Sequence, residues 1–328
     1  MDHFYIVTRF GLGQKNLEFY KHELSFAKSF LFPSIINQSD KCFTFLLLCD
    51  KNISKEIIEK VEDFFAKSGV NLVIYLHDPF EDYLLKPDIS RIITKSSNIG
   101  DRITSVRVDI DDAISSNYVE IVKTKINENV KDYRRIHLTT SVGVYYYHQY
   151  GKFLLVKKPN YSVVAISDIH DKGFKNSYDY PHSTIYKSIS KEPLSLNIEM
   201  DIENVMWFRS IRQNSCSRAE RQVSKFEVSN IYFRRFITSI LRLIRRSNIY
   251  PLKFLSFEYI KIHFGISKNI EILEVKLPNV PKAFFKIKNS KYTSRLAAKQ
   301  FFLDYCRDKS VMCNLPHTEE DIRTFYNF

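Results

Sequence analysis

The amino-acid sequence predicts an α/β fold in which a mostly parallel sheet is flanked by helices. Strand-like apolar runs and helical patterns alternate through the first 126 residues. One run, residues 43–49, is apolar almost throughout, which is typical of a strand buried on both faces of a parallel sheet. Strand–helix–strand units with right-handed crossovers build such a sheet. The composition agrees, since 44% hydrophobic and 26% charged residues are values of a folded protein.

Each element of this sheet follows from a local pattern. Apolar runs predict strands at residues 4–7, 43–49, 70–76 and 103–108. Helical spacing of apolar residues predicts helices near residues 17–31, 54–68, 88–95 and 114–126. We expect Pro33 to stop the first helix, Ser54 to cap the second and Gly69 to end it.

The rest of the chain changes character twice. Antiparallel strands are predicted by the β-rich runs at residues 136–147, 152–156 and 162–166. After about residue 215 the pattern becomes that of basic, aromatic helices. We therefore expect a first domain over residues 1–215 and a mostly helical, basic C-terminal region over residues 216–328.

The start of the chain and its cysteines indicate a cytoplasmic protein. No basic and apolar leader of the secretory kind follows Met1. The longest apolar run is far too short to span a bilayer. The five cysteines show no metal-binding spacing, and an odd number without a framework suits a reducing compartment.

Polar side chains follow the expected strands at the points where they end. Thr8 and Arg9 follow the first strand, Asp50 the second, His77 and Asp78 the third and residues 109–112 the fourth. The carboxyl ends of parallel strands meet at one edge of a sheet, where ligands bind. We therefore expect these residues to converge on one site.

The segment Asp109-Ile110-Asp111-Asp112 carries the most specific chemistry. Mg²⁺ and Mn²⁺ prefer oxygen ligands, and such an ion often takes one or two carboxylates together with substrate phosphates. In an extended segment, Asp109 and Asp111 point the same way and can share one ion. The competing interpretation is that Asp111 and Asp112 cap the next helix and complement its dipole. The position after the fourth strand favours the metal site.

Three blocks of the chain resemble a known family. Residues 4–10 are similar to the opening of the bacterial rhamnosyltransferase family of GT-A-like proteins, and residues 106–114 resemble its R-x-D-x-D-D-A-[IL] block. Residues 207–214 are more loosely similar to its late W-x-x…H-x-x-N block. The likeness covers about the first 215 residues, and the acidic block is its most specific part.

This resemblance implies a GT-A-like fold of the Rossmann type. It also implies transfer of a sugar, with rhamnose as the candidate, from a nucleotide-sugar donor to a glycan or lipid-linked acceptor in cell-surface polysaccharide synthesis. Mn²⁺ or Mg²⁺ would then be the cofactor, with the acidic segment as its ligands. Gln213 stands where the family's late block has a histidine. If that histidine is a ligand, His170 or His182 would have to replace it.

The residues at the strand ends are the candidates for holding the donor. The guanidinium of Arg9 offers fixed paired donors to a phosphate. Arg107 could touch the donor or pair with a carboxylate. Asp50 could accept hydrogen bonds from the base or ribose, or cap a helix. Thr8 and Asp109 complete the expected donor site.

An inverting transferase needs a carboxylate that takes the proton of the acceptor hydroxyl. Asp168 and Asp171, in a polar loop after a β-rich run, are the candidates, and an ordinary turn is the alternative. Trp207 is the one tryptophan of the chain. It could stack on a sugar, although a lone tryptophan is typical of a core.

The positive charge of the chain is concentrated in one segment. Residues 207–253 contain eleven Lys and Arg but two acids, which accounts for most of the net charge of +12. Within this segment, residues 230–246 have the pattern of a basic amphipathic helix. It could lie on an anionic membrane surface, which would place the protein at the inner face of the cell membrane. It could instead pack on the first domain with its arginines in solvent.

Other classes of function stay open. A metal-dependent nucleotidyltransferase or phosphohydrolase also uses paired aspartates at a strand end. A basic nucleic-acid-binding protein without catalysis would fit the charge, but the sequence carries no recognisable nucleic-acid motif, so we expect no such partner. The departure at Gln213 would also fit a pseudoenzyme that keeps the fold.

Overall fold

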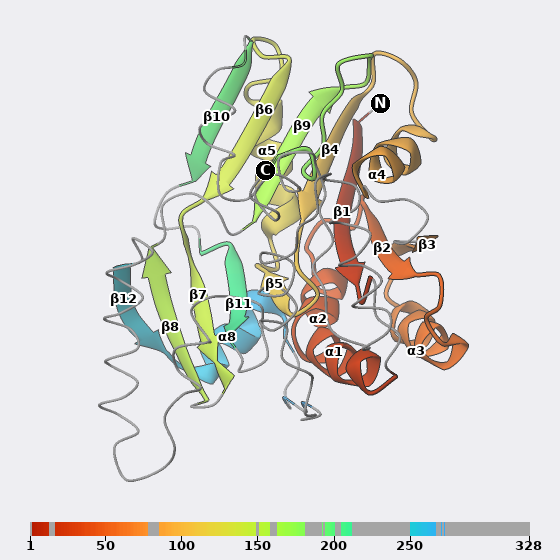
Figure 1. Cartoon of the computed structure of the whole chain (residues 1–328). Coiled ribbons are helices and arrows are strands. Elements are labelled where there is room, and N and C mark those ends of the chain that lie inside the picture. The colour runs from red at the N-terminus through yellow and green to blue at the C-terminus, as the bar shows by residue number, and fades with distance from the viewer. Residues whose placement is uncertain are drawn as a thin grey trace, which may run out of the picture.

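In the computed structural model, the described part of the chain forms two sheets with helices packed around them (Figure 1). The description covers residues 2–12, 17–77, 85–148, 151–157, 163–180, 192, 194–200, 205–211, 250–266, 270 and 272. The helices are α1 (Leu17–Ser29), α2 (Leu31–Ile36), α3 (Lys55–Phe65), α4 (Leu85–Thr94), α5 (Tyr118–Asn127) and α8 (Phe257–Phe264). The strands are β1 (Asp2–Phe10), β2 (Thr44–Asp50), β3 (Asn71–His77), β4 (Arg102–Arg107), β5 (Asp112–Ile114), β6 (Arg135–Thr140), β7 (Val142–Tyr147), β8 (Lys152–Lys157), β9 (Val164–Ile169), β10 (Ser195–Met200), β11 (Trp207–Ile211) and β12 (Tyr250–Leu255).

The larger sheet has seven strands in the order β10-β6-β9-β4-β1-β2-β3. β1 runs parallel to β2 and β4, β2 to β3, and β10 to β6, whereas β9 is antiparallel to both of its neighbours. The sheet is therefore mostly parallel, and the expected α/β class is confirmed. β2 is buried along nearly its whole length, as its apolar run predicts, while β3 at the edge is partly exposed.

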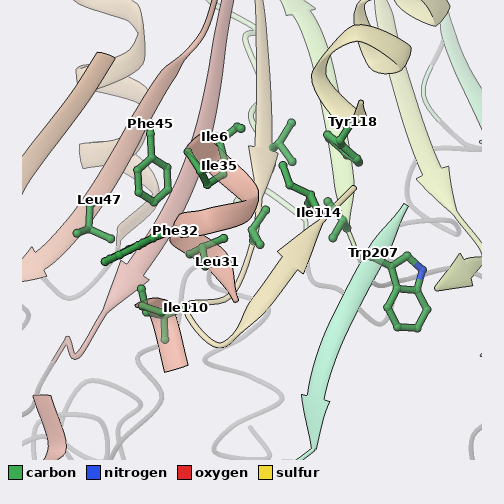
Figure 2. Packing of buried hydrophobic residues seen from close by; sticks show 14 of the residues in the cluster. Ile6, Leu31, Phe32, Ile35, Phe45, Leu47, Ile110, Ile114, Tyr118 and Trp207 are labelled. Carbon is green, nitrogen blue, oxygen red and sulfur yellow. The ribbon is translucent and has the colours of Figure 1, made fainter. Parts of the chain in front are cut away.

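One face of this sheet is apolar and covered by helices. Phe4, Ile6 and Phe10 of β1 share a buried cluster with side chains from α1, α2, α3 and α5. Figure 2 shows Ile110, which lies between Asp109 and Asp111, and Ile114, two residues after Asp112, in the same cluster as the side chains of α2. The segment 109–112 is thus anchored to the core by its apolar neighbours.

The opposite face of the sheet carries more polar groups. Successive residues of a strand point to opposite faces, so Tyr5 and Arg9 face away from the apolar cluster. On this side the Tyr5 hydroxyl hydrogen-bonds Ser96 Oγ, just after α4, at 2.9 Å. Ser90 of α4 in turn accepts a 2.8 Å hydrogen bond from the amide of Asn176. α4 and the segment after β9 therefore cover this face.

The smaller sheet has five strands in the order β12-β8-β7-β11-β5. Trp207 of β11 is fully buried in it, and its indole N–H donates to the carbonyl oxygen of Thr140 at 3.2 Å. A Cβ on Gly143 would lie 2.0 Å from the indole ring, so the glycine makes room for it. Trp207 is therefore a core residue in this structure.

Three local expectations are wrong. Pro33 does not stop a helix but lies in the first turn of α2, where its missing N–H costs nothing, and the break falls at Phe30. The expected helix over residues 114–126 begins only at Tyr118, because Ile114 is the last residue of β5 and residues 115–117 form the turn that leads into the helix. The run 136–147 is two strands, β6 and β7, which lie in different sheets.

The described part of the C-terminal region continues the smaller sheet. β12 pairs with β8, and Ile260 and Phe264 of α8 pack with Val144 and Phe208 in one apolar cluster. These elements lie beyond the expected boundary at residue 215. The basic segment 230–246 lies outside the described residues.

Candidate functional site at the carboxyl edge of the larger sheet

The expected convergence of strand ends is borne out by the strand register. Arg9 of β1 lies beside Leu48 of β2, and Asp50 at the end of β2 lies beside His77 of β3. On the other side of β1, Arg107 at the end of β4 pairs with Val7. The carboxyl ends of β1 to β4 therefore form one edge, and the acidic segment begins at that edge.

The acidic segment is a tight turn and not an extended strand. The N–H of Asp112 donates to the carbonyl oxygen of Asp109 at 3.1 Å, and Asp112 then begins β5. The aspartates do not cap a helix either, because α5 has Asn117 at its N-cap position. Both interpretations of the backbone made from the sequence are thus wrong, and the turn itself sets where the carboxylates lie.

The second half of the turn is held by β11. Asp112 pairs with Arg209 across the antiparallel β5–β11 ladder. Ser210 donates a hydrogen bond from Oγ to Asp111 Oδ2 at 3.0 Å and from its N–H to Asp112 Oδ1 at 3.3 Å. Asp111 is partly buried and Asp112 is buried.

The acidic turn and the neighbouring Arg209 of β11 carry charges of opposite sign. Burial raises the pKa of the Asp112 carboxyl well above its ordinary value, and the neighbouring Asp111 adds to this, while Arg209 opposes it. Burial works against the charged form of Arg209, but Asp112 raises the pKa of the guanidinium above its usual range, with smaller effects from Asp109 and Asp111. The Arg209 guanidinium thus interacts electrostatically with the carboxylates of the acidic turn.

A second group, on the polar face of the sheet, contains Arg9, Arg107 and Tyr178. The Arg107 guanidinium carbon lies 4.7 Å from the centre of the Tyr178 ring. Arg9 hydrogen-bonds the Tyr178 hydroxyl, which also donates to the carbonyl oxygen of Val7 at 3.4 Å. Burial raises the pKa of Tyr178, against the opposing effect of both guanidiniums, and Asp109 raises it further. Asp109 therefore lies within the electrostatic reach of both groups.

Asp50 and Thr8, which are also expected to bind the nucleotide-sugar, point to opposite faces of the sheet. Asp50 lies two residues after Leu48 on the face of the sheet that carries Arg9, and its Oδ1 accepts bonds from the backbone N–H and amide of Asn52 at 2.8 and 3.0 Å. It closes a turn and does not cap α3, whose N-cap position is Ser54. Thr8 is fully buried and alternates with Arg9, so its hydroxyl points to the apolar face. The structure does not bring the Thr8 side chain to the polar group.

Asp168 and Asp171 lie at the opposite edge of the sheet. Asp168 pairs with Ile103, near the start of β4, because β9 runs antiparallel to it. The Asp168 carboxylate is fully buried and accepts two bonds from Arg135, at 2.8 and 3.0 Å. Asp171 accepts a 2.5 Å bond from Arg134. These aspartates do not share one site with the acidic turn, so their expected part as its acceptor base has no support in the geometry.

The histidines expected as a further metal ligand do not join the turn in the described part of the chain. His170 lies beyond the end of β9 at the far edge and hydrogen-bonds Ser97 Oγ at 2.9 Å. His182, Gln213 and Asp78 lie outside the described residues. Among the described residues, no group of three or more His, Cys, Asp or Glu side chains could hold a metal ion by itself.

Two carboxylates still suit a hard divalent cation whose shell is completed by substrate. Asp109 and Asp111 are both partly exposed, and carboxylate oxygens together with phosphates and water are the usual ligands of Mg²⁺. Asp112 fits this ligand set less well, since its carboxyl is buried against the β11 backbone. The residues present therefore fit an ion shared with a bound diphosphate.

Sequence reasoning missed Tyr178, Arg209 and Ser210 as site residues. Tyr178 follows an antiparallel strand and returns to the edge through a loop with no recognised motif. Arg209 and Ser210 reach the turn only because β11 pairs with β5, about one hundred residues earlier in the chain. The one available signal was the late block around Trp207, which includes Arg209.

Comparison with known proteins places the chain in a family. A family model for sugar-transferring proteins, described as "Putative rhamnosyl transferase", matches residues 22–223. Sugar-transferring proteins are glycosyltransferases. Because the match covers more than half of the chain, the protein belongs to this rhamnosyl transferase family. No curated protein sequence matches the chain.

Several solved structures are similar at low identity. A cytidylyltransferase from Leptospira borgpetersenii is 12% identical with a TM-score of 0.37, over 78% of this chain and 98% of that one. S. aureus TarS residues 1–349, in complex with UDP, is 9% identical with a TM-score of 0.34, over 99% and 90%. The glycosyltransferase GlyE from Streptococcus pneumoniae is 10% identical with a TM-score of 0.35, over 77% and 65%. Likeness at this level defines no function.

No helix within the described ranges is long and apolar enough to cross a membrane.

Proposed function

We propose that the protein transfers a sugar, with rhamnose as the candidate, from a nucleotide-sugar donor to a glycan or lipid-linked acceptor. The observation that carries this proposal is the meeting of Arg9, Asp50, Arg107 and the acidic turn at one sheet edge in a member of a sugar-transferring family. Ligands of such sheets bind beyond the carboxyl ends of the strands. The donor would therefore lie across β1, β2 and β4.

Different residues at this edge would bind different parts of the donor. Arg9 and Arg107 would bind the diphosphate, because guanidiniums present fixed pairs of N–H donors to phosphate oxygens. Asp50, on the same face as Arg9, would accept hydrogen bonds from the ribose or base. Charge grows on the diphosphate as the bond to the sugar breaks, and donors that are already in place stabilise it without reorganising.

Asp109 and Asp111 would hold Mn²⁺ or Mg²⁺ together with the donor phosphates. When bound, such an ion supplies positive charge to the departing diphosphate. Ser210 orients the Asp111 carboxylate through its hydroxyl, and Arg209 offsets the charge of the buried Asp112. This pairing lets the turn keep two carboxylates directed at a ligand while the third is neutralised within the protein.

The acceptor would be delivered from an anionic membrane surface by the basic segment 230–246. Each basic residue near such a surface contributes about 1 kcal/mol of attraction. Co-sedimentation with vesicles of neutral and anionic lipid tests this part. Binding to anionic vesicles that disappears when Arg242, Arg245 and Arg246 are replaced by glutamine supports it, and equal binding to neutral vesicles contradicts it.

The central experiment is a thermal-shift screen of nucleotide-sugars in the presence of Mn²⁺. The wild type is compared with Asp111→Ala and with the control Asp63→Ala, which removes an exposed carboxylate from α3. A ligand at one hundred times its Kd stabilises a protein by about 2.7 kcal/mol, so a true donor shifts the melting temperature measurably. We expect one donor class to stabilise the wild type and the control but not Asp111→Ala.

Product analysis separates this function from the other enzyme classes. Consumption of the donor that depends on added acceptor sugar supports transfer. Donor cleavage at an equal rate without any acceptor indicates a phosphohydrolase, and stabilisation by nucleoside triphosphates alone indicates a nucleotidyltransferase. If no nucleotide-sugar stabilises the wild type, the proposed function is wrong.

A further inference from the structure

Tyr178 joins the two arginines of the carboxyl edge. Its ring lies under the Arg107 guanidinium at 4.7 Å, and its hydroxyl oxygen accepts a hydrogen bond from Arg9. The hydroxyl hydrogen is directed to the carbonyl oxygen of Val7, which lies two residues before Arg9 in β1 and is the register partner of Arg107 in β4. One fully buried side chain thus contacts both guanidiniums.

The ring of Tyr178 is itself held in place from two sides. The backbone N–H of Tyr178 donates to the Asn176 side-chain oxygen at 2.8 Å. The N–H of Ser177 donates to Ser105 Oγ in β4 at 2.8 Å, and the Asn176 amide donates to Ser90 Oγ in α4 at 2.8 Å. The segment 176–178 is therefore tied to a sheet strand and to a helix, and the ring has little freedom to leave the arginines.

The charges at this point favour an anion. Arg9 and Arg107 bring two positive charges together, and like charges at short range repel each other. The face of an aromatic ring attracts one guanidinium, while the hydroxyl oxygen attracts the other, so Tyr178 lowers the cost of holding both. Of the charged groups that act on the Tyr178 hydroxyl, Arg107 and Arg9 are positive and Asp109 is negative.

One buried donor points to a missing partner. Within the described residues, Arg9 Nε is buried and has no hydrogen-bond acceptor. Buried donors in folded proteins are nearly always satisfied, so an unsatisfied one indicates a partner that the described part of the chain does not supply. An oxygen of a bound phosphate group would supply it.

We propose that Tyr178 is a positioning residue that fixes Arg9 and Arg107 as a paired guanidinium site for the diphosphate of the donor. This inference rests on the proposed function, since it names the residue that organises the same phosphate site. Holding both arginines before the donor arrives reduces the ordering cost of binding. The consequence is tighter binding of any diphosphate, and a smaller effect on the step that breaks the sugar bond.

Binding of inorganic pyrophosphate, measured by titration calorimetry, tests this independently of the sugar. Tyr178→Phe keeps the ring and loses the bond to Arg9, and Tyr178→Leu loses both contacts. We expect pyrophosphate affinity to fall by about threefold to tenfold in the first variant, as for one lost hydrogen bond. We expect a fall of at least about tenfold in the second, because the cation–π contact is lost as well.

Tyr180→Phe is the matched control. It removes a tyrosine hydroxyl two residues away that bonds Glu192 at 2.8 Å on the side of Arg135, and it should leave pyrophosphate affinity within about twofold of the wild type. With a donor in hand, the Tyr178 variants should raise KM more than they lower kcat, which is the sign of lost binding shared by ground and transition states.

The outcomes distinguish the inference from the function on which it rests. If Tyr178→Phe and a folded Tyr178→Leu bind pyrophosphate as the wild type does, the inference is wrong and the proposed function stands. If Tyr178→Leu fails to fold, unchanged affinity in Tyr178→Phe overturns the inference and the expected loss supports it. If the wild type binds neither pyrophosphate nor any nucleoside diphosphate, both proposals fail together.

Discussion

Removing the Asp168 carboxylate should cost stability and not transfer activity. The buried carboxylate accepts bonds at 2.8 and 3.0 Å from Arg135, at 2.8 Å from the N–H of Lys175 and at 2.9 Å from that of Ile169. The guanidinium of Arg135 also bonds Glu192, so a single anion remains when Asp168 becomes alanine. The change therefore strands a cation that is mostly buried at the amino edge of the sheet.

The magnitude follows from these contacts. Breaking a buried ion pair by removing one partner typically costs about 3–5 kcal/mol. Because Glu192 still accompanies Arg135, we expect about 3 kcal/mol for Asp168→Ala. In a chain of this size that corresponds to a fall in melting temperature of roughly 5–10 °C. Asp168→Asn keeps one acceptor oxygen, which can serve the N–H of Ile169 or that of Lys175 but not both, so it should cost less than Asp168→Ala without restoring full stability.

Chemical unfolding and a transfer assay below both melting temperatures measure the two effects separately. The control is Asp132→Ala, which removes an exposed carboxylate from the turn before β6 and should change neither quantity. We expect Asp168→Ala to be less stable and to retain transfer within about threefold, since mutations at distant sites act independently. An unchanged melting temperature with loss of transfer would refute this reasoning and would support Asp168 as the base that takes the proton of the acceptor.

Three further predictions follow from other parts of the structure. Gly143→Ala places a Cβ 2.0 Å from the Trp207 ring and should cost about 1–3 kcal/mol, with a changed tryptophan fluorescence; a normal melting temperature would contradict this packing. Burial lowers the pKa of His137 from 6.5 to about 3. Between these two pH values His137 is therefore protonated in the unfolded chain and neutral in the folded chain. Stability should fall with pH from 6.5 toward 3, and His137→Phe should remove about 2 kcal/mol of the loss between pH 6.5 and 5, seen in urea unfolding; parallel pH profiles would disprove it. Ser210→Ala removes the bond to Asp111 and should lower kcat/KM by about tenfold, while Ser210→Thr keeps the hydroxyl and most of the activity; equal losses in both would show that the bond does not matter.

The parallel edge of the larger sheet could be predicted from the sequence because each strand there has its own local signal. The apolar run of β2 and the polar residues at the carboxyl ends of β1 and β2 and after β4 are sufficient to place Arg9, Asp50 and Asp109 together. The alternation of strands and helices predicts that the strands are parallel, and the crossover rule then fixes the winding of the sheet. No knowledge of distant pairing is needed for this half of the site.

The rest of the site depends on which distant strands pair with one another, and local sequence patterns do not predict that pairing. The β-rich run at residues 162–166 predicts an antiparallel strand, but it does not show which strands this one pairs with. The antiparallel direction of β9 carries Asp168 away from the acidic turn and lets the loop after it bring Tyr178 back. Likewise, only long-range pairing brings Arg209 and Ser210 to the turn.

The most direct test of the account is the position of Mn²⁺ in a crystal grown with a nucleoside diphosphate, located by its anomalous scattering. The account predicts one ion that bridges the Asp109 and Asp111 carboxylates and the diphosphate, with the diphosphate also bound by Arg9 and Arg107. An ion and nucleotide bound away from the carboxyl edge of β1 and β4, or a diphosphate bound there without contact to either aspartate or arginine, would contradict it.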